Sequence, residues 1–433
     1  MLFRSPTFIS LSPNVEKDDI WLALKLIFCP WEWKNGQAIR ELEEKFKSYL
    51  EIEHAFALNS GRSAFLAILS ALGLEKDDEV LLQAFTCNAA VNPIIWSNLK
   101  PIFVDIEKET ININPQDLEK KITSKSRVVL VQHTFGVSAK INEILEICKK
   151  HNLILIEDCA HSLGASYNGQ KVGSFGKASF FSLGRDKIIS SVYGGIAVTN
   201  DKILANRIKD FQKKSSMPSG YWILQQLLHP VLTKMIVMPL YSFFGIGKYF
   251  LVAFQRLKII SKAVHKKEKQ GEQPKYLPQK MPNVLSILGL HQFKKLERFN
   301  NHRYEIVKIY DQSAKKGVYM RYPIFLGNSD KVLKKFKEKN IYLDDGWRKS
   351  IIVPQGTDEI KMGYRKGSCP IAEEVADQIV NLPTHINISK KKAKEIRICL
   401  ANARQNLDSR KHKHKILNKK IFRNFSKINF YHI

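Results

Sequence analysis

Three polar residues stand in one stretch of the sequence at positions that suit chemistry. Asp158 follows an apolar run, residues 153–156, which predicts a buried parallel strand. Ser182 follows a second apolar run, residues 178–181, and Lys187 comes five residues later. Because open α/β sheets bind ligands at the carboxyl ends of their strands, we expect these side chains to border one site.

An aspartate, a hydroxyl and a lysine in this order suit pyridoxal phosphate (PLP). A lysine amine forms a Schiff base with the cofactor's aldehyde, and a carboxylate keeps the pyridine nitrogen protonated so that the ring draws electrons. Hydroxyl and N–H donors hold the phosphate. The assignments would be Lys187, Asp158 and Ser182. On spacing alone, an ordinary α/β protein with a strand-end aspartate and a surface serine and lysine is an equally open interpretation.

Further motifs follow one another in a fixed order along the chain. They are Ser60–Ala64 (SGRSA), Asp78–Val80 (DEV), Phe85–Thr86, Pro101–Asp105 (PIFVD), His133–Gly136 (HTFG), Glu157–His161 (EDCAH) and Phe181–Ser182 with Lys187. In this order and spacing, from about residue 35 to 210 and again from 280 to 400, the chain resembles the DegT/StrS family of nucleotide-sugar aminotransferases. The resemblance implies an α/β protein of PLP-transferase fold type I. Its large domain has a mostly parallel central sheet flanked by helices, and its smaller C-terminal domain is α+β.

The resemblance also implies which residues bind the cofactor. Lys187 would be the catalytic residue, and the cofactor-binding set would be Lys187, Asp158, His161, Ser182, Gly61, Arg62, Ser63 and Cys87. Gly61 to Ser63 open a helix whose free N–H groups would hold the phosphate, because a helix N-terminus attracts anions. Without the resemblance, simple helix capping and a structural histidine explain Ser63 and His161 equally well.

Three positions depart from the family's pattern. Arg62 stands where the family usually has threonine, and its guanidinium would contact the phosphate or point into solvent. Cys87 stands where an aromatic residue often covers the pyridine ring, so that Cys87, Phe85 or another residue would take this place. Tyr193 stands where the family commonly has glutamate. Tyr193 and His133 are the candidates for substrate contact, and we expect no metal ligands.

Alternating strand and helix patterns predict a sheet covered on both faces. We expect five segments along the chain. These are an N-terminal helical segment (1–50), the large PLP-binding domain (51–215), an apolar and basic insertion (216–280), a linking helix with the small C-terminal domain (281–400), and a disordered basic tail (401–433).

The insertion is rich in large apolar and aromatic residues and then turns basic. Its charge-free piece after Lys234 spans residues 235–247 and is interrupted by Pro239, whereas a membrane-spanning helix needs about 20 apolar residues. One alternative is a helical hairpin in a membrane interface, with lysines on anionic lipid and four aromatic residues near the headgroups: Tyr221, Trp222, Tyr241 and Tyr249. The other is an extra helical layer, buried in a dimer or over the active site.

The charge and the cysteine content of the sequence indicate which partners the protein binds and in which compartment it works. A net charge of +28 indicates an anionic partner, such as a nucleotide sugar or lipid headgroups, and we see no nucleic-acid-binding fold. The six cysteines form no CxxC pair, which fits a reducing cytoplasm. The N-terminal residues show no secretory signal. We therefore expect a cytoplasmic protein, peripheral to the inner face of the membrane if residues 216–270 bind lipid.

The family resemblance implies an activity. A homodimeric enzyme would move an amino group from an amino acid, typically glutamate, to a keto-sugar attached to a nucleotide, for surface polysaccharide or glycan biosynthesis. Two alternatives stay open. One is a PLP enzyme of the same fold with other sugar chemistry, such as a dehydratase. The other is a non-catalytic, membrane-associated regulatory or scaffold protein, which the altered positions Arg62, Cys87 and Tyr193 keep open.

Overall fold

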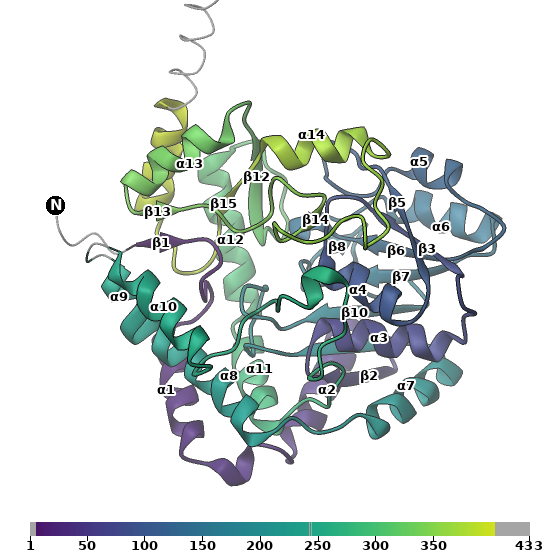
Figure 1. The fold of residues 1–433 in the computed structure, drawn as a ribbon, viewed down its shortest axis with the longest axis horizontal. Coiled ribbons are helices and arrows are strands. Elements are labelled where there is room, and N and C mark those ends of the chain that lie inside the picture. Colours follow the sequence, from purple (N-terminus) through teal and green to yellow (C-terminus); the bar gives the residue numbers. More distant parts are fainter. Residues whose placement is uncertain (1–5, 242, 244, 403–433) are drawn as a thin grey trace, which may run out of the picture.

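A seven-stranded sheet forms the centre of the computed structural model, which describes residues 6–241, 243 and 245–402 (Figure 1). Within this sheet only β11 runs antiparallel to its neighbours, so that the expected mostly parallel α/β architecture is confirmed. In spatial order the strands are β2 (His54–Leu58), β11 (Gly195–Thr199), β10 (Ala178–Ser182), β7 (Ile154–Asp158), β6 (Ser126–Gln132), β3 (Glu79–Gln83) and β5 (Lys100–Val104).

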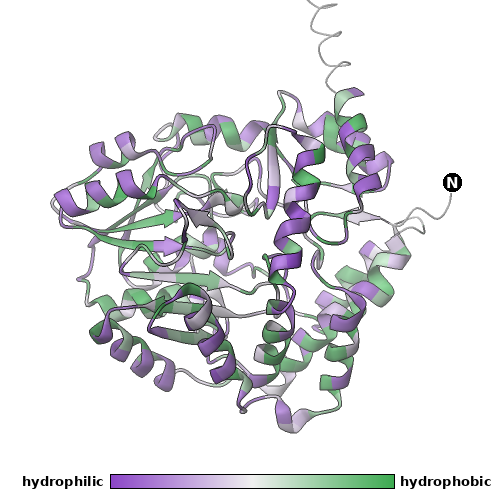
Figure 2. Cartoon of the chain, turned by 180° about the vertical axis from the view of Figure 1, so that it is seen from behind, coloured by the Kyte–Doolittle hydropathy of each residue, from purple (hydrophilic) through white to green (hydrophobic). Residues whose placement is uncertain are grey.

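The sheet is buried on both faces. Along β6, Val128 and Leu130 belong to one apolar cluster, whereas Val129 and Val131 belong to another. This alternation follows from the two-residue period of a strand. The helices that connect these strands are α3 (Gly61–Leu72), α4 (Asn88–Trp96), α5 (Pro115–Lys120) and α6 (Ile141–Lys150), and α7 (Lys202–Lys214) follows the last of them, β11. Figure 2 shows hydrophobic residues along the strands and hydrophilic residues on the outer helices. The strand ends are therefore the places where polar side chains can gather.

The small domain combines strands and helices, as expected. Helix α12 (Leu296–Tyr310) leads into it, and β12 (Arg321–Phe325) pairs antiparallel with β15 (Ile379–Pro383). Its other elements are α13 (Ser329–Glu338), β13 (Ile341–Tyr342), β14 (Ile352–Val353) and α14 (Pro370–Gln378). Strand β14 pairs with β4 (Thr86–Cys87) of the large domain, which ties the two domains together beside residue 87. Most of the predicted basic tail, 403–433, lies outside the described residues.

The N-terminal segment divides between two parts of the molecule. Its helices are α1 (Lys17–Ile27), the short 3-10 helix η1 (Pro30–Glu32) and α2 (Ala38–Leu50), as the apolar spacing predicts. Before them, β1 (Thr7–Phe8) pairs in parallel with β13 of the small domain. The expectation of one helical unit over residues 1–50 therefore omits a strand, because two residues are too few to give a strand pattern in the sequence.

The insertion forms a helical hairpin. Helix α8 (Gly220–Leu232), the π-helical turn η3 (Thr233–Val237) and α9 (Met238–Tyr241) join into one 22-residue helix, and α10 (Ile246–Arg256) packs back against η3 and α9. The expected interruption at Pro239 is wrong, because the π turn just before it accommodates the missing proline N–H. By length and composition this helix can cross a membrane, yet half of its most apolar window is buried inside the protein.

After the hairpin the chain returns to the large domain. This return segment, residues 257–282, carries the short 3-10 helix η4 (Glu268–Gln270) and leads to α11 (Asn283–Phe293). Helix η4 packs against α4, and the return segment also reaches β2 through a bridge between Leu58 and Lys280. The return segment therefore runs across the end of the sheet where the candidate residues lie.

Candidate active site

A cavity of about 490 Å³ opens where the carboxyl ends of β7 and β10 meet the N-terminus of α3. Of the ten residues predicted for the site, eight line this cavity: Gly61, Arg62, Cys87, Asp158, His161, Ser182, Lys187 and Tyr193. The other two, Ser63 and His133, do not. The fold thus brings residues from five separate places in the sequence to one cavity.

Asp158 lies at the end of β7 and is 6% exposed. Burial raises the pKa of its carboxyl to about 6, while the Ala160 N–H and the charge of Lys187 act in the opposite direction. The Ala160 N–H donates to Asp158 Oδ1 at 2.9 Å. A buried carboxylate with one such donor favours a cationic ligand, such as a protonated ring nitrogen, at its free oxygen.

Lys187 lies in the loop between β10 and β11 and lines the cavity. Its Nζ is 3.8 Å from Asp186 Oδ1, and its main-chain carbonyl accepts a hydrogen bond from the Asn14 amide. Arg303, which is fully buried, donates to Asn14 Oδ1 at 2.7 Å and to the Ile188 carbonyl at 3.0 Å. The hydrogen bonds from Asn14 and Arg303 therefore hold the backbone around Lys187 in place, while its amine faces the cavity.

The N-terminus of α3 provides anion-binding groups at the same cavity. Ser60 caps this helix, and its Oγ accepts a hydrogen bond from the Ser63 N–H at 3.1 Å. The N–H groups of Gly61 and Arg62 have no acceptor inside the helix, because the first turn never has one. Ser182 Oγ lies beside them, since a Cβ added to Gly61 would sit 3.4 Å from it. These donors suit a phosphate group.

Ser63 takes no direct part in this cradle. Its N–H is used by the cap, and its Oγ donates to Asn59 Oδ1 at 2.7 Å. Glycine is required on the neighbouring strand, because a Cβ on Gly195 would collide with the Ser60 carbonyl. The close approach of α3 to β11 and β10 therefore depends on small residues on both sides.

An aromatic wall closes one side of the cavity. The His161 ring stacks on Phe135 with centroids 5.6 Å apart, and Trp347 meets His161 edge-on at 5.0 Å. Burial lowers the pKa of His161 well below its ordinary value, so that the ring is neutral. Its Nδ1 is buried and has no hydrogen-bond partner in the described part of the chain, which leaves it available to a ligand hydroxyl.

Residue 87, where the family often has an aromatic residue, is a cysteine that lines the cavity. Cys87 lines the cavity, whereas Phe85 is fully buried and packs against Trp347 at 5.7 Å. Burial also raises the pKa of the Cys87 thiol, so that it acts as a small neutral side chain. Trp347, from the small domain, supplies an aromatic surface at the cavity that the sequence analysis missed.

The Arg62 side chain is largely buried and faces the return segment of the insertion. It forms an ion pair with Glu268, which is completely buried, and its Nη2 donates to the Ala263 carbonyl at 3.3 Å. Glu268 Oε1 also accepts from the Tyr276 hydroxyl at 2.7 Å and from the His265 N–H at 2.9 Å. Arg62 therefore anchors the return segment of the insertion, and its charge is neutralised within the chain.

Tyr193 and Arg185 hold the same segment. The Tyr193 hydroxyl donates to the carbonyls of Lys262 at 2.7 Å and Ala263 at 3.1 Å, and Arg185 donates to the Ser261 carbonyl at 2.7 Å. Six residues of the insertion complete the cavity lining: His229, Leu251, Gln255, Ala263, Val264 and Lys269. The insertion thus contributes to the lining of the site, and this does not decide between a membrane contact and a covered layer for its outer surface.

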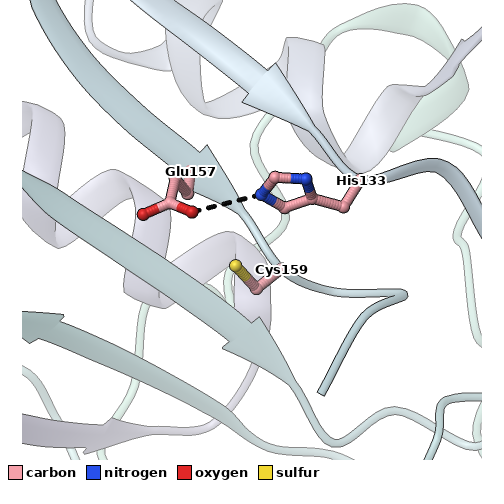
Figure 3. A group of neighbouring side chains, drawn as sticks. All are labelled: His133, Glu157 and Cys159. Carbon is pink, nitrogen blue, oxygen red and sulfur yellow. Dashed lines mark hydrogen bonds and ion pairs between the residues drawn. The ribbon is translucent and has the colours of Figure 1, made fainter. Parts of the chain in front are cut away.

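His133 lies in a separate buried cluster with Glu157 and Cys159 (Figure 3). Its Nε2 is 3.2 Å from Glu157 Oε2, and its Nδ1 accepts the Ala139 N–H at 3.2 Å. The Glu157 carboxylate also accepts three backbone N–H groups, at 2.7–2.8 Å, from Gly173, Phe175 and Gly176. Although the three side chains are close enough to hold a metal, the Glu157 carboxylate already accepts the N–H groups of the turn after β9 (Gln170–Lys171), and both ring nitrogens of His133 are in hydrogen bonds. We interpret this cluster as structural.

The chain is similar to known proteins over most of its length. A GDP-perosamine synthase from Vibrio cholerae is 36% identical over 177 residues, 41% of this chain and 48% of that protein. The aligned part therefore spans about half the length of that relative. The uncharacterized protein MJ1066 from Methanocaldococcus jannaschii is 28% identical over 402 residues, 86% of this chain and 91% of that protein.

The structural comparison concerns the fold. The crystal structure of DesI, determined in the presence of its TDP-sugar product, superimposes with a TM-score of 0.70 at 20% identity and covers 96% of this chain and 97% of DesI. The family model of the DegT/DnrJ/EryC1/StrS aminotransferases matches residues 18–226 and 257–401, and the unmatched residues 227–256 lie inside the insertion. Because this match spans most of the sequence, the chain belongs to the DegT/DnrJ/EryC1/StrS aminotransferase family.

Proposed function

We propose that this protein is a PLP-dependent aminotransferase. It would move an amino group from an amino acid, with glutamate as the expected donor, to a keto-sugar attached to a nucleotide, in surface polysaccharide or glycan biosynthesis. The observation that carries this proposal is one cavity lined by Lys187, Asp158, Ser182 and the N-terminus of α3. Membership of the aminotransferase family supports it.

The residues present fit PLP. The N–H groups of Gly61 and Arg62 with the Ser182 hydroxyl would hold its phosphate, and Asp158 would hold its ring nitrogen. His161 Nδ1, which is buried and unpartnered, would face its ring hydroxyl. Cys87 and Trp347 would flank the ring. The cavity thus offers a suitable group for each polar part of the cofactor.

The chemistry follows from the same groups. Bound PLP supplies an electron sink joined to the amine-bearing carbon of the substrate. Lys187 Nζ would move a proton from that carbon of the donor to the carbon of the cofactor that receives the amino group, and with the sugar it would move a proton in the opposite direction. Asp186, 3.8 Å from Nζ, would stabilise the ammonium form that Nζ takes during each transfer. Asp158 would keep the ring nitrogen protonated.

We propose that the partners are a nucleotide sugar, an amino-acid donor and a second copy of this chain. The net charge of +28 supports an anionic substrate. The six cysteines are free thiols, which supports work in the cytoplasm. A membrane contact through residues 216–270 would place the enzyme at the inner face of the membrane.

The absorbance spectrum of the purified protein with PLP tests the proposal. We expect a visible band that glutamate bleaches, and we expect Lys187→Ala to lose this band. The matched control is Lys269→Ala, which removes the amine of another lysine of the same cavity. This control should keep the band, because Lys269 Nζ donates to the Gln355 carbonyl at the cavity's outer side.

Three outcomes would contradict the proposal in different ways. If the wild type shows no band, the chain is not a PLP enzyme, and the scaffold alternative replaces it. A band that survives in Lys187→Ala would exclude this lysine as the attachment point. A band that glutamate leaves unchanged would indicate a PLP enzyme of another reaction class, such as a sugar dehydratase.

A further inference from the structure

Helix α10 of the insertion exposes apolar side chains on the surface of the protein. Tyr249 is 73% exposed, and Phe250, Ile246 and Val252 are 40%, 38% and 37% exposed. A surface helix normally turns its apolar side chains toward the core, whereas α10 buries only Gly247. An outward-facing apolar helix of this kind indicates a surface that another phase or molecule covers.

The charged residues that flank α10 in the sequence are all basic. Between Asp210 and Glu268 the sequence holds no acidic residue, while it holds nine lysines and arginines. Lys248 and Arg256 stand on α10 itself, and both are exposed. Basic residues interleaved with exposed aromatic residues are typical of helices that lie in the interface of an anionic membrane.

The packing of α10 connects this surface with the active-site cavity. A Cβ added to Gly247 would collide with the Val237 carbonyl, so that α10 lies tightly against the end of the long helix α8–α9. Leu251 and Gln255, on α10, line the cavity. One helix therefore separates the cavity from the outer surface, a thickness of about 10 Å.

We propose that α10 docks on an anionic membrane surface. Tyr249 and Phe250 enter the boundary between headgroups and acyl chains, while Lys248 and Arg256 contact lipid phosphates. A lipid surface suits this face better than a second copy, because two copies would each bring the same positive charge to the contact. The cavity then opens next to the membrane, where a substrate or product carried on a lipid can reach it.

The protein lies on the membrane and does not cross it through this hairpin. Half of the most apolar window of the long helix α8–α9 is buried against the rest of the protein, and α1 packs along α8 (Figure 1). Docking through α10 requires neither PLP nor catalysis. The inference therefore stands or falls separately from the proposed function.

Vesicle flotation of the full chain tests the inference. We expect the wild type to float with vesicles of equal phosphatidylcholine and phosphatidylglycerol, and to stay behind with phosphatidylcholine alone. The variant Tyr249→Ser/Phe250→Ser should bind the anionic vesicles more weakly, by about tenfold or more. Its matched control, Ile203→Ser/Ile360→Ser, removes two other exposed apolar side chains and should float like the wild type.

Charge reversal tests the second half of the contact. Lys248→Glu/Arg256→Glu should weaken binding to anionic vesicles by about tenfold or more. The control Lys334→Glu/Lys337→Glu makes the same change in net charge on α13 and should bind like the wild type. Because every variant keeps residues 403–433, a difference between the two pairs is due to α10 and not to the basic tail.

Several results would overturn the inference. Failure of the wild type to float, or equal flotation of all four variants, would exclude docking through α10. If Tyr249→Ser/Phe250→Ser instead turned a dimer into a monomer in light scattering, a second copy would cover this face. Far-ultraviolet circular dichroism of the same samples shows whether each variant is folded, and their PLP absorbance band is recorded separately. A wild type that floats without showing the band would contradict only the proposed function.

Discussion

The floor and the wall of the cavity arise in different ways. The floor consists of Asp158, Ser182, Lys187 and the start of α3, and each of these follows directly from a strand or opens a helix. The wall consists of the insertion's return segment and Trp347, which come from distant parts of the chain. The floor is specified by local sequence, whereas the wall depends on long-range packing. A change in the floor should therefore affect chemistry, and a change in the wall should affect stability or access.

The largest expected effect lies in the floor. Lys187→Ala should slow the transfer of the amino group from glutamate by about 10³-fold or more, because the amine that moves the proton is gone. Release of 2-oxoglutarate from glutamate measures this rate, and it does so in a variant that lacks the band. Lys269→Ala, in the wall, should slow it far less. Equal losses in the two variants would show that floor and wall do not differ in this way.

The next effect lies in the wall. Glu268→Ala leaves the Arg62 guanidinium buried without its partner, which should lower the free energy of unfolding by about 3–5 kcal/mol. The double variant Arg62→Leu/Glu268→Leu removes both charges and should lose less. Urea unfolding measures both. If the double variant loses as much as Arg62→Leu and Glu268→Leu together, the pair does not couple.

A smaller effect concerns the pH dependence of the floor. Burial raises the pKa of Asp158 to about 6, so that below pH 6 its carboxyl becomes neutral and no longer pairs with a cationic ring nitrogen. PLP affinity should therefore fall about tenfold per pH unit as the pH drops below 6. Asp158→Asn should bind PLP more weakly at pH 7.5 and should lack this part of the pH dependence. Identical pH profiles for the two proteins would exclude Asp158 from the site.

The smallest effect again lies in the wall. Tyr193→Phe removes a hydroxyl that donates to two carbonyls of the return segment, which should cost about 1 kcal/mol of stability. The PLP band should stay unchanged. The matched control is Tyr221→Phe, whose hydroxyl donates to the Lys258 carbonyl at an exposed position and should cost close to nothing. Loss of the PLP band in Tyr193→Phe would show that the Tyr193 hydroxyl is needed for cofactor binding, as the floor residues are.

The sequence pattern located the residues of the floor but not the direction of every side chain. His133 ends β6 beside the strand that carries Asp158, yet its ring turns to Glu157 and away from the cavity. Ser63 stands in the helix start, yet its N–H and hydroxyl are used by Ser60 and Asn59. Strand-end position predicts nearness to a site, while the available hydrogen-bond partners decide where a side chain points.

The partner of Arg62 shows a different limit. A basic residue at a helix start suggests an anionic ligand, and nothing in its neighbourhood along the sequence names Glu268. The pair forms because the insertion returns over α3, where a buried guanidinium must meet a carboxylate. Trp347 was missed for the same reason, since it reaches the cavity from the small domain.

The sequence by itself determined the family, through the order of its motifs, the fold class, and the residues at strand and helix ends that line the cavity. The fold class and these positions depend on local periodicity, on turn residues and on the rule that ligands bind at the carboxyl ends of parallel strands. Only the tertiary structure decided that the insertion covers the site, that Arg62 pairs with Glu268, and that α10 faces outward. These features depend on which distant surfaces exclude water together, and packing of this kind leaves no pattern within one segment of the chain.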